Sequence, residues 1–144
     1  MRVDFYHLTA LPLEQVLPRI CERLLGEGER LLVVAAEDRL GPLDSRLWSY
    51  TREAFLPHGL ASGAGADAQP ILLSTGTEPV NGARNVALAD GAWRDEALGF
   101  DRIFYFFDDA NLDAARTTWR SLKDNAAAEP HYWKQDGGRW VEGP

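Results

Sequence analysis

The feature that most constrains the fold of this chain is a short, uninterrupted apolar segment, RLLVVAA at residues 30–36. Gly28 lies just before it, and Glu37 and Asp38 follow it. A strand that is apolar on both faces has to be covered on both faces, as in the parallel sheets of α/β proteins. A second segment, RIFYFF at residues 102–107, is aromatic and β-branched and also predicts a strand. Together the two segments predict an α/β layered fold.

The other predicted elements alternate strands with helices. Alternation at residues 2–8 indicates a strand. Helical spacing covers residues 13–25, but Pro18 interrupts it, so we expect either a kink or a helix start near Pro18. Residues rich in glycine and alanine at 59–69 predict a surface loop. Further helices are predicted at residues 42–50 and 111–127, and further strands at residues 71–74, 85–89, 132–135 and 139–142, the last two as a hairpin.

This order, β-α-β-α-β-β-β-α-β-β, predicts a three-layer α/β/α domain with a mixed, mostly parallel sheet. A length of 144 residues fits a single domain over residues 1–144. No segment approaches the roughly 18 apolar residues of a membrane span, and none near residue 1 reads as an export signal. We therefore expect a cytoplasmic protein without membrane contact. The single cysteine, Cys21, lies in an apolar helical pattern and is expected to be buried.

The charge of the chain disfavours a surface that grips nucleic acid as a whole. There are 22 acidic residues against 15 lysines and arginines, which gives a net charge of −7. Proteins whose main task is to bind phosphate backbones are usually basic. A local basic patch remains compatible with this composition.

Motifs that would indicate catalysis or a cofactor are missing from the sequence. There is no phosphate-binding loop of the G-x-x-x-x-G-K-[ST] type, and the glycine-rich residues 63–68 do not follow an apolar strand. His7, His58 and His131 are scattered without metal-ligand spacing. The acidic pairs at 37–38, 95–96 and 108–109 are explained by loop ends and helix N-termini. The sequence thus predicts no metal, no cofactor and no catalytic site.

A basic stripe stands out on the predicted helix at 111–127. Arg116, Arg120 and Lys123 follow i, i+4, i+7 spacing and fall on one face, with Trp119 at its border. Guanidinium groups bind carboxylates bidentately, and an aromatic wall packs apolar groups. The stripe therefore suggests a site for an acidic peptide that ends in an aromatic residue. The alternative is that these cations only complement the helix dipole and face solvent.

A second aromatic feature lies near the predicted helix at 42–50. Trp48 and Phe55 supply apolar bulk in a short segment. Aromatic residues are enriched at the centres of protein interfaces, so this segment is either core or a partner surface.

These residues carry a resemblance to a known family. Residues 43–48 (LDSRLW) and 55–60 (FLPHGL) are similar to the L-D-x-x-L-W…F-x-P-H-x-L signature of DNA polymerase III chi subunits. The similarity continues in the same order along nearly the whole chain. Further matches are DFYHL at residues 4–8, QPI at 69–71, Asn81 with Arg84, FDR at 100–102, AR–WR–LK at 115–123 and YWKQ at 132–135.

The resemblance implies a Rossmann-like fold without a nucleotide, in a non-catalytic accessory subunit of the bacterial DNA polymerase III holoenzyme. Such a subunit pairs with the psi subunit, which tethers it to the clamp-loader complex. It also binds the acidic, phenylalanine-terminated tail of the single-stranded DNA-binding protein. The protein would then link the polymerase to coated template and contact DNA only indirectly.

Site residues follow from the same resemblance, position by position. Trp48 and Phe55 match the psi-facing aromatic residues. Arg116 matches the basic residue that holds the tail, and Trp119 an aromatic position one turn on. Arg120 and Lys123 are added from helix geometry. The family often has a lysine one turn before the arginine, where this chain has Leu112 and Asp113.

Two other functions stay open at this point. One is a small Rossmann-like nucleotide-binding enzyme that uses Asp108, Asp109 or His58 near strand ends. The other is a direct single-stranded DNA binder that uses the stripe of Arg116, Arg120 and Lys123.

Overall fold

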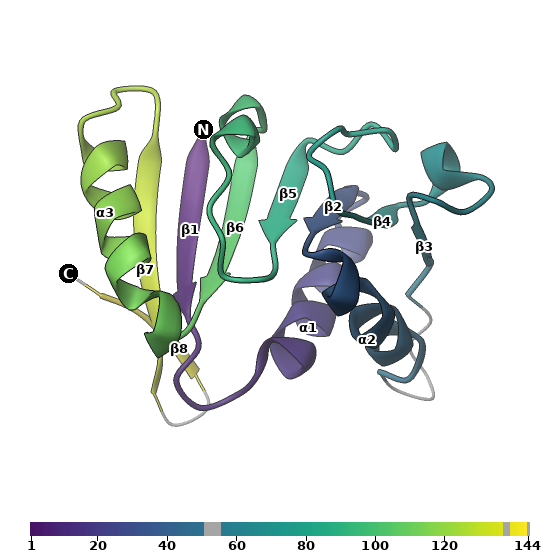
Figure 1. Ribbon diagram of the computed structural model, residues 1–144, viewed down its shortest axis with the longest axis horizontal. Coiled ribbons are helices and arrows are strands. Elements are labelled where there is room, and N and C mark those ends of the chain that lie inside the picture. The colour runs from purple at the N-terminus through teal and green to yellow at the C-terminus, as the bar shows by residue number, and fades with distance from the viewer. Residues whose placement is uncertain (51–55, 137–138, 144) are drawn as a thin grey trace.

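The computed structural model describes residues 1–50, 56–136 and 139–143 and contains one eight-stranded sheet flanked by helices (Figure 1). The principal helices are α1 (Leu13–Gly26), α2 (Glu37–Trp48) and α3 (Leu112–Lys123). Short 3-10 helices are η1 (Ala66–Ala68), η2 (Asp95–Gly99) and η3 (Asp109–Asn111). The strands are β1 (Arg2–His7), β2 (Leu31–Val34), β3 (His58–Leu60), β4 (Ile71–Ser74), β5 (Asn85–Leu88), β6 (Arg102–Phe107), β7 (Glu129–Asp136) and β8 (Arg139–Glu142).

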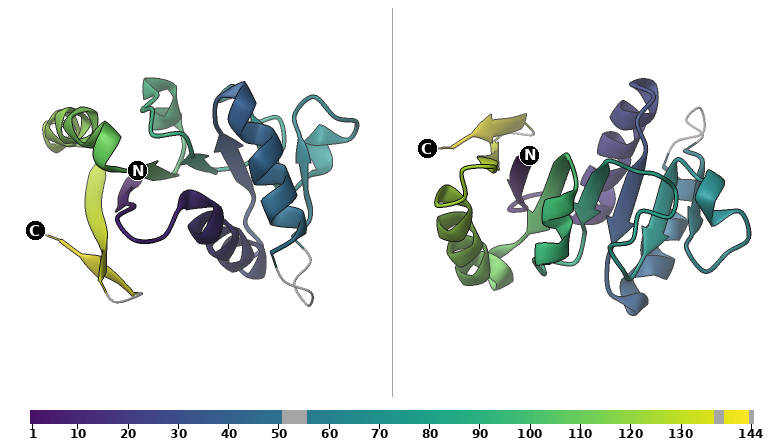
Figure 2. Two further views of the ribbon diagram at one scale, coloured as in Figure 1. Left: turned by 60° about the horizontal axis from the view of Figure 1, so that its bottom comes forward. Right: turned by 90° about the horizontal axis from the view of Figure 1, so that it is seen from above.

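The sheet has the order β3-β4-β2-β5-β6-β1-β7-β8, and its strands are parallel except for the antiparallel β7–β8 pair. Helices α1 and α2 pack on one face with Tyr6 and Phe104, whereas α3 packs on the other with Phe5 and Tyr105. Figure 2 shows α3 and α1 on opposite sides of the sheet. The predicted three-layer α/β/α fold with a mixed, mostly parallel sheet is therefore confirmed. All four residues of β2 are fully buried, as a strand covered on both faces requires.

Of the two alternatives predicted at Pro18, a kink or a helix start, the helix start is wrong, because α1 begins at Leu13 and runs through the proline. Pro18 has no N–H, so the carbonyl of Glu14 loses its partner within the helix. Arg46 of α2 replaces that partner, since its Nε donates to the Glu14 carbonyl at 3.1 Å. The buried proline thus creates an acceptor that ties α1 to α2.

Two further boundaries differ from the prediction in the region between β2 and β4. Helix α2 begins at Glu37, five residues before the predicted start, and carries Pro42 inside it. Glu37 and Asp38 stand in its first turn, where acidic side chains complement the helix dipole. The predicted loop at residues 59–69 contains the end of β3, which pairs with β4, and also η1. The sheet therefore has one strand more than the sequence predicted.

Helix α3 ends at Lys123, four residues earlier than predicted. Asn125 explains the stop, because its side-chain oxygen accepts from Ala127 N at 3.0 Å and its carbonyl accepts from Ala128 N at 3.0 Å. Asparagine favours such local turns over a continued helix. The chain then enters β7, which is longer than predicted and pairs with β1 along its length.

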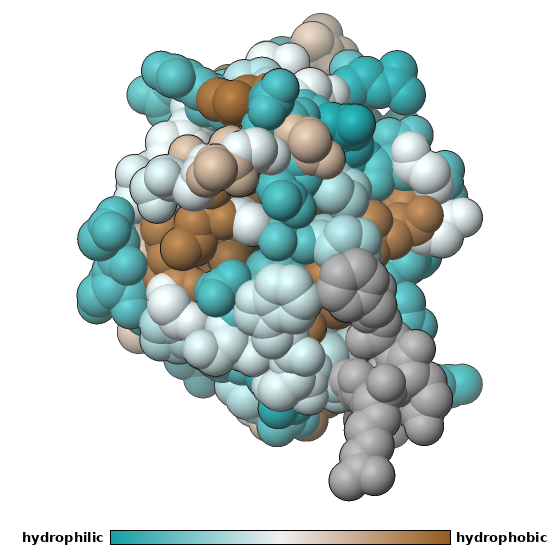
Figure 3. All heavy atoms as spheres, turned by 90° about the vertical axis from the view of Figure 1, so that its right-hand side faces the viewer, coloured by the Kyte–Doolittle hydropathy of each residue, from teal (hydrophilic) through white to brown (hydrophobic). Residues whose placement is uncertain are grey.

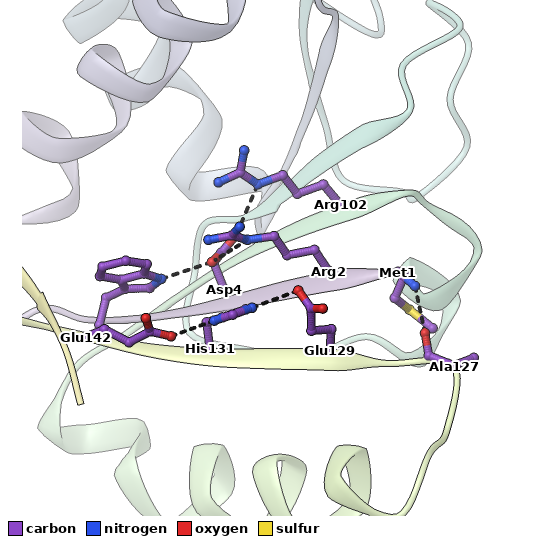
Figure 4. Close-up of polar contacts among 9 residues, drawn as sticks. Met1, Arg2, Asp4, Arg102, Ala127, Glu129, His131 and Glu142 are labelled. Atoms are coloured by element: carbon purple, nitrogen blue, oxygen red, sulfur yellow. Dashed lines mark hydrogen bonds and ion pairs between the residues drawn. The ribbon is translucent and has the colours of Figure 1, made fainter. Parts of the chain in front are cut away.

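A buried carboxylate on β1 holds the β7–β8 hairpin against the sheet (Figure 4). The side chain of Asp4 is fully buried and accepts from the Trp133 indole N–H at 2.9 Å. It also accepts from Arg2 Nε at 3.1 Å and from Arg102 Nε at 3.0 Å. One carboxylate thereby joins β1, β6 and β7, which satisfies the rule that buried charges are paired.

His131 forms a clasp at the start of the same hairpin, between Glu129 at 2.9 Å and Glu142 (Figure 4). The hydrogen bonds that His131 donates to Glu129 and then to Glu142 raise the pKa of His131, and the bond accepted from His131 lowers the pKa of Glu129. The raised imidazole pKa gives stability that is full below about 6.5 and lost as pH rises through the raised value. The lowered pKa of the Glu129 carboxyl gives stability that is present above about pH 4.5 and is lost as the pH falls through the lowered value.

We therefore expect His131→Gln to lower the melting temperature by a few degrees near pH 6 and to have a smaller effect at pH 9. The carboxylates of Glu129 and Glu142 are 73% and 49% exposed, so solvent keeps the effect small. Thermal melts by circular dichroism at both pH values measure it. An equal loss at both values would show that the charge of His131 is irrelevant to the hairpin.

Candidate functional site

The principal candidate site is an apolar groove between α3 and the sheet, with a volume of about 280 Å³. We call it the α3 groove. It is smaller than the roughly 300–1,000 Å³ that encloses a drug-sized ligand, so it fits one side chain better than a whole ligand. Its lining consists of Phe5, His7, Phe107, Leu112, Ala115, Arg116, Trp119 and Tyr132.

Trp119 forms the aromatic wall that α3 contributes to the α3 groove. Its indole meets the ring of Phe5 edge-on at 5.2 Å and the ring of Tyr132 edge-on at 6.4 Å. Ala115 and Leu122 on the same helix are buried against the sheet and fix its position. Such edge-to-face pairs stabilise beyond the area they bury. Contacts with Phe5 and Tyr132 therefore hold the Trp119 indole in place in the groove.

The predicted basic stripe divides into parts with different surroundings. Arg116 lines the α3 groove, with its side chain 61% exposed and its Nη1 4.0 Å from the exposed Asp113 carboxylate. Lys123 lies over the outer face of Trp119, with Nζ 4.9 Å from the ring centre. Arg120 is exposed and does not line the groove. Arg116 and Trp119 thus line the groove together, Lys123 contacts Trp119 without lining the groove, and Arg120 does not line it.

A hydrogen-bonded chain of three side chains closes the end of the α3 groove. His7 contacts the Tyr132 hydroxyl at 2.7 Å through Nδ1 and the Asp109 carboxylate at 2.8 Å through Nε2. The imidazole also stacks on Phe107 at 4.9 Å. Burial raises the pKa of the Tyr132 phenol, so its hydroxyl remains a donor at neutral pH. The chain holds Tyr132 in its place in the groove wall.

Sequence reasoning missed half of this lining, because four of its eight residues come from three different strands. The alternation at residues 2–8 did place Phe5 and His7 on one side of a strand. Nothing local shows that Phe107 and Tyr132 lie on the same face of the sheet. Only the order β6-β1-β7 brings them together.

The predicted psi-facing aromatic Trp48 lies at the end of α2 with 55% of its surface exposed. Its ring is 4.3 Å from the ring of His58. His58 is buried, with Nδ1 2.6 Å from the Leu56 carbonyl. Its Nε2 is 3.0 Å from the Asp44 carboxylate, but without the geometry of a hydrogen bond. His58 is thus a support beneath Trp48, and the other predicted aromatic, Phe55, lies outside the described residues.

The face beside Trp48 mixes polar and apolar side chains. Figure 3 views the side of the molecule that carries β3 and α2 and shows separate apolar patches between polar side chains. Trp48 and Val80 are among the large hydrophobic residues with more than half of their surface exposed. Exposed aromatic residues of this kind are typical of protein interfaces.

The crevice at the carboxyl ends of β1, β5 and β6 is the place where Rossmann-like folds bind phosphates. Here a side chain of the protein occupies the backbone N–H groups of the loop after β1. The backbone N–H groups of Thr9, Ala10 and Leu11 all donate to the Gln135 side-chain oxygen, at 3.0, 2.8 and 3.1 Å. A phosphate in this loop would have to displace Gln135.

The acidic residues at strand ends also bind groups of their own chain. Asp108 caps η3 by accepting from Ala110 N at 3.0 Å, as predicted for this pair. Asp90 is paired with Arg94 at 2.9 Å. Although burial opposes the change, hydrogen bonds from Arg94 and from backbone N–H groups lower the pKa of Asp90. These carboxylates serve as caps and ion-pair partners.

Three other sequence predictions concern single features of the molecule. Cys21 is buried, and burial raises the pKa of its thiol to about 12, as expected for a small hydrophobic residue. Within the described ranges, no group of three or more metal-ligating side chains is placed to hold a metal ion. Among the helices that the structure describes, none is long and apolar enough to cross a membrane.

Comparison with known proteins places this geometry in a family. The model of the family described as DNA polymerase III chi subunit, HolC, matches residues 1–129. A protein named DNA polymerase III subunit chi, from Pseudomonas aeruginosa, is 36% identical over 85 residues. That alignment covers 56% of this chain and 58% of the relative's length. Because the family model spans most of the sequence, the chain belongs to the DNA polymerase III chi subunit family.

Proposed function

We propose that this protein is an accessory subunit of the bacterial DNA polymerase III holoenzyme that binds the acidic C-terminal tail of single-stranded DNA-binding protein in the α3 groove. One observation carries the proposal: a single apolar groove has Arg116 at its rim and aromatic rings from two sides. A tail that ends in phenylalanine offers one carboxylate and one ring. The groove has one place for each.

The carboxylate would bind Arg116, whose guanidinium is exposed and held only loosely by Asp113 at 4.0 Å. A guanidinium binds a carboxylate through two parallel hydrogen bonds. The ring of the terminal phenylalanine would enter between Phe107, Trp119 and Tyr132. Lys123 over Trp119 adds positive charge for the acidic residues that precede the phenylalanine.

The second half of the proposal is that the psi subunit binds the surface around Trp48 and so connects this protein to the clamp-loader complex. Two observations support this half: Trp48 is exposed, and its ring packs against the buried ring of His58. A large aromatic ring on a rigid base is a typical anchor at an interface centre. Phe55 belongs to this proposal through the family resemblance.

The two alternative functions differ in what favours them. An enzyme that binds a nucleotide at the strand ends is disfavoured, because Gln135 already binds the loop N–H groups. A DNA-binding stripe of Arg116, Arg120 and Lys123 has only exposed cations and one indole, of which Lys123 covers one face. The tail is favoured because the groove offers an apolar pocket beside its cation.

The proposal is tested by titrating the protein with a synthetic peptide of several acidic residues ending in phenylalanine, by calorimetry. We expect Arg116→Ala to weaken binding at least roughly tenfold, since a charge-assisted hydrogen bond is lost. Arg84→Ala is the matched control, because Arg84 is also an exposed arginine, outside the α3 groove. Binding should weaken with added salt, as expected for exposed charges.

Two results would contradict the tail proposal. One is equal affinity of Arg116→Ala and Arg84→Ala for the peptide. The other is unchanged affinity when the terminal phenylalanine is replaced by alanine, since the aromatic lining would then have no role. For psi, loss of co-purification in Trp48→Ala with unchanged peptide binding is the expected result, and retained co-purification would contradict that half.

A further inference from the structure

A second pocket, on the opposite side of the sheet from the α3 groove, combines cations with aromatic rings. It lies between α1 and the β7–β8 hairpin and has a volume of about 150 Å³. Figure 2 (left) shows β8 and α1 on the side of the sheet that faces away from α3. We call it the arginine pocket. The residues that matter for its chemistry are Tyr6, Arg19, Arg23, Gln135, Arg139 and Trp140.

The charge of the arginine pocket is unusual for this protein. Three of the chain's 15 basic residues line it, and its lining contains no acidic residue, although the chain has 22 of them. Arg19 and Arg23 are one helical turn apart on α1, and Arg139 comes from β8. In the described part of the chain, no carboxylate lies within ion-pair distance of these three guanidinium groups. Arg23 lies beside the Tyr6 phenol and Arg19 beside the Tyr50 phenol, and these neutral hydroxyl groups leave the positive charge of the two guanidinium groups in place.

The aromatic side of the pocket is built from Tyr6 and Trp140. The Tyr6 ring is buried in the sheet and stacks on Trp133 at 6.5 Å. Trp140 is half-buried and meets Tyr6 edge-on at 5.0 Å. Because Trp140 is half-buried and lines the pocket, part of its surface is open beside the arginines.

The hairpin that supplies half of the pocket is fixed rather than loosely attached. Gln135 pairs with Trp140 across the β7–β8 ladder and accepts three backbone N–H groups from the loop before α1. Trp133, two residues earlier, donates to the buried Asp4 carboxylate. These residues lie beyond the segment matched by the family model, which ends at residue 129. The pocket is preorganised by contacts that the family match does not cover.

We propose that the arginine pocket binds a nucleotide unit, with its phosphate on Arg19, Arg23 and Arg139 and its base against Trp140. A phosphate has more charge and more acceptor oxygens than a carboxylate, so three converging guanidinium groups suit it better. Single-stranded nucleic-acid sites pair a cationic patch with aromatic rings on which bases stack. At about 150 Å³ the pocket is too small to enclose a whole nucleotide, so in this proposal it encloses the phosphate, while the sugar and base lie outside it with the base against Trp140. The net charge of −7 disfavours a long strand.

The test is a set of titrations at low salt with four probes: thymidine monophosphate, an oligothymidylate of about 15 nucleotides, inorganic phosphate, and the acidic peptide ending in phenylalanine that tests the tail proposal. We expect both nucleotide probes to bind, and the double variant Arg19→Ala/Arg23→Ala to weaken them at least roughly tenfold. Arg84→Ala, an exposed arginine outside this pocket, should leave binding unchanged. Trp140→Leu should weaken the nucleotides by about fivefold or more and leave inorganic phosphate unaffected.

The probes separate the sources of the ligand. If only thymidine monophosphate binds, the pocket is assigned to free nucleotides. If thymidine monophosphate and oligothymidylate both bind, it is assigned to nucleic-acid strands as well. Either result supports the proposal.

Three results overturn the proposal. The first is that neither nucleotide probe binds the folded protein, and the second is that inorganic phosphate binds as tightly as the nucleotides. The third is that only the acidic peptide binds and that the double variant abolishes this binding. Oligothymidylate binding that is lost in Arg116→Ala would also overturn it, because the strand would then lie on α3. None of these outcomes depends on the tail proposal.

Discussion

Replacing Asp4 with alanine is expected to lower the free energy of unfolding by about 3 kcal/mol. Removing one partner of a buried charge network typically costs about 3–5 kcal/mol. The lower end applies here because Arg2 is 41% exposed and can regain water once the carboxylate is gone. The remaining loss falls on Arg102 and on the Trp133 indole N–H, which are less exposed to solvent.

Urea denaturation at pH 7 measures this effect, with an unchanged slope as the sign that only stability differs. Asp101→Ala is the matched control, because that carboxylate is 71% exposed and 3.7 Å from Arg84. Exposed pairs of this kind contribute little, so its change should stay within about 0.5 kcal/mol. If both variants lose the same stability, Asp4 does not join β1, β6 and β7 in the way its contacts suggest.

Replacing Trp119 with alanine is expected to have the second largest effect, with consequences for both stability and tail binding. The truncation removes the edge contacts to Phe5 and Tyr132 and opens one wall of the α3 groove. Buried tryptophans lose about 3–5 kcal/mol on truncation. Because Trp119 is half-buried, about 2 kcal/mol is the expected loss. Peptide affinity should fall at least roughly tenfold through the loss of an aromatic anchor.

Trp119→Phe separates the two consequences. A phenyl ring keeps part of the contact with Phe5, so this variant should recover part of both the stability and the affinity. Peptide titrations are made at a temperature where circular dichroism shows each variant to be folded. Unchanged peptide affinity in folded Trp119→Ala would remove the aromatic wall from the tail site and leave Arg116 alone.

The layered fold could be predicted because its signals are local. The apolar residues of β2 and β6 require two covering layers, and these strands are buried as predicted. Proline was misleading for the opposite reason. Pro18 and Pro42 are compatible with their helices in this tertiary context, and at Pro18 a distant arginine, Arg46, satisfies the carbonyl. No window of sequence around Pro18 contains that partner.

The α3 groove, too, could be predicted only where its residues lie close together in the sequence. Helical spacing on α3 was enough to single out Arg116 and Trp119, because both lie on one element. The opposite wall depends on the order of strands, which local patterns do not encode. His7, for example, contacts Asp109 and Tyr132, which are 102 and 125 residues away along the chain. A single histidine in a strand gives no sign of such partners.

The position of β1 between β6 and β7 has a consequence for how the protein is made. Arg2 pairs with Arg102 on one side and with Glu129 on the other, so β1 is the first strand synthesised and among the last to find partners. At the usual rate of roughly 5–20 residues per second, about 100 residues of delay amount to roughly 5–20 s on the ribosome. The β4-β2-β5 part of the sheet can form during that time. Phe5 and Tyr6, which are buried in the folded protein, therefore stay without the strand partners of β1 for several seconds of synthesis.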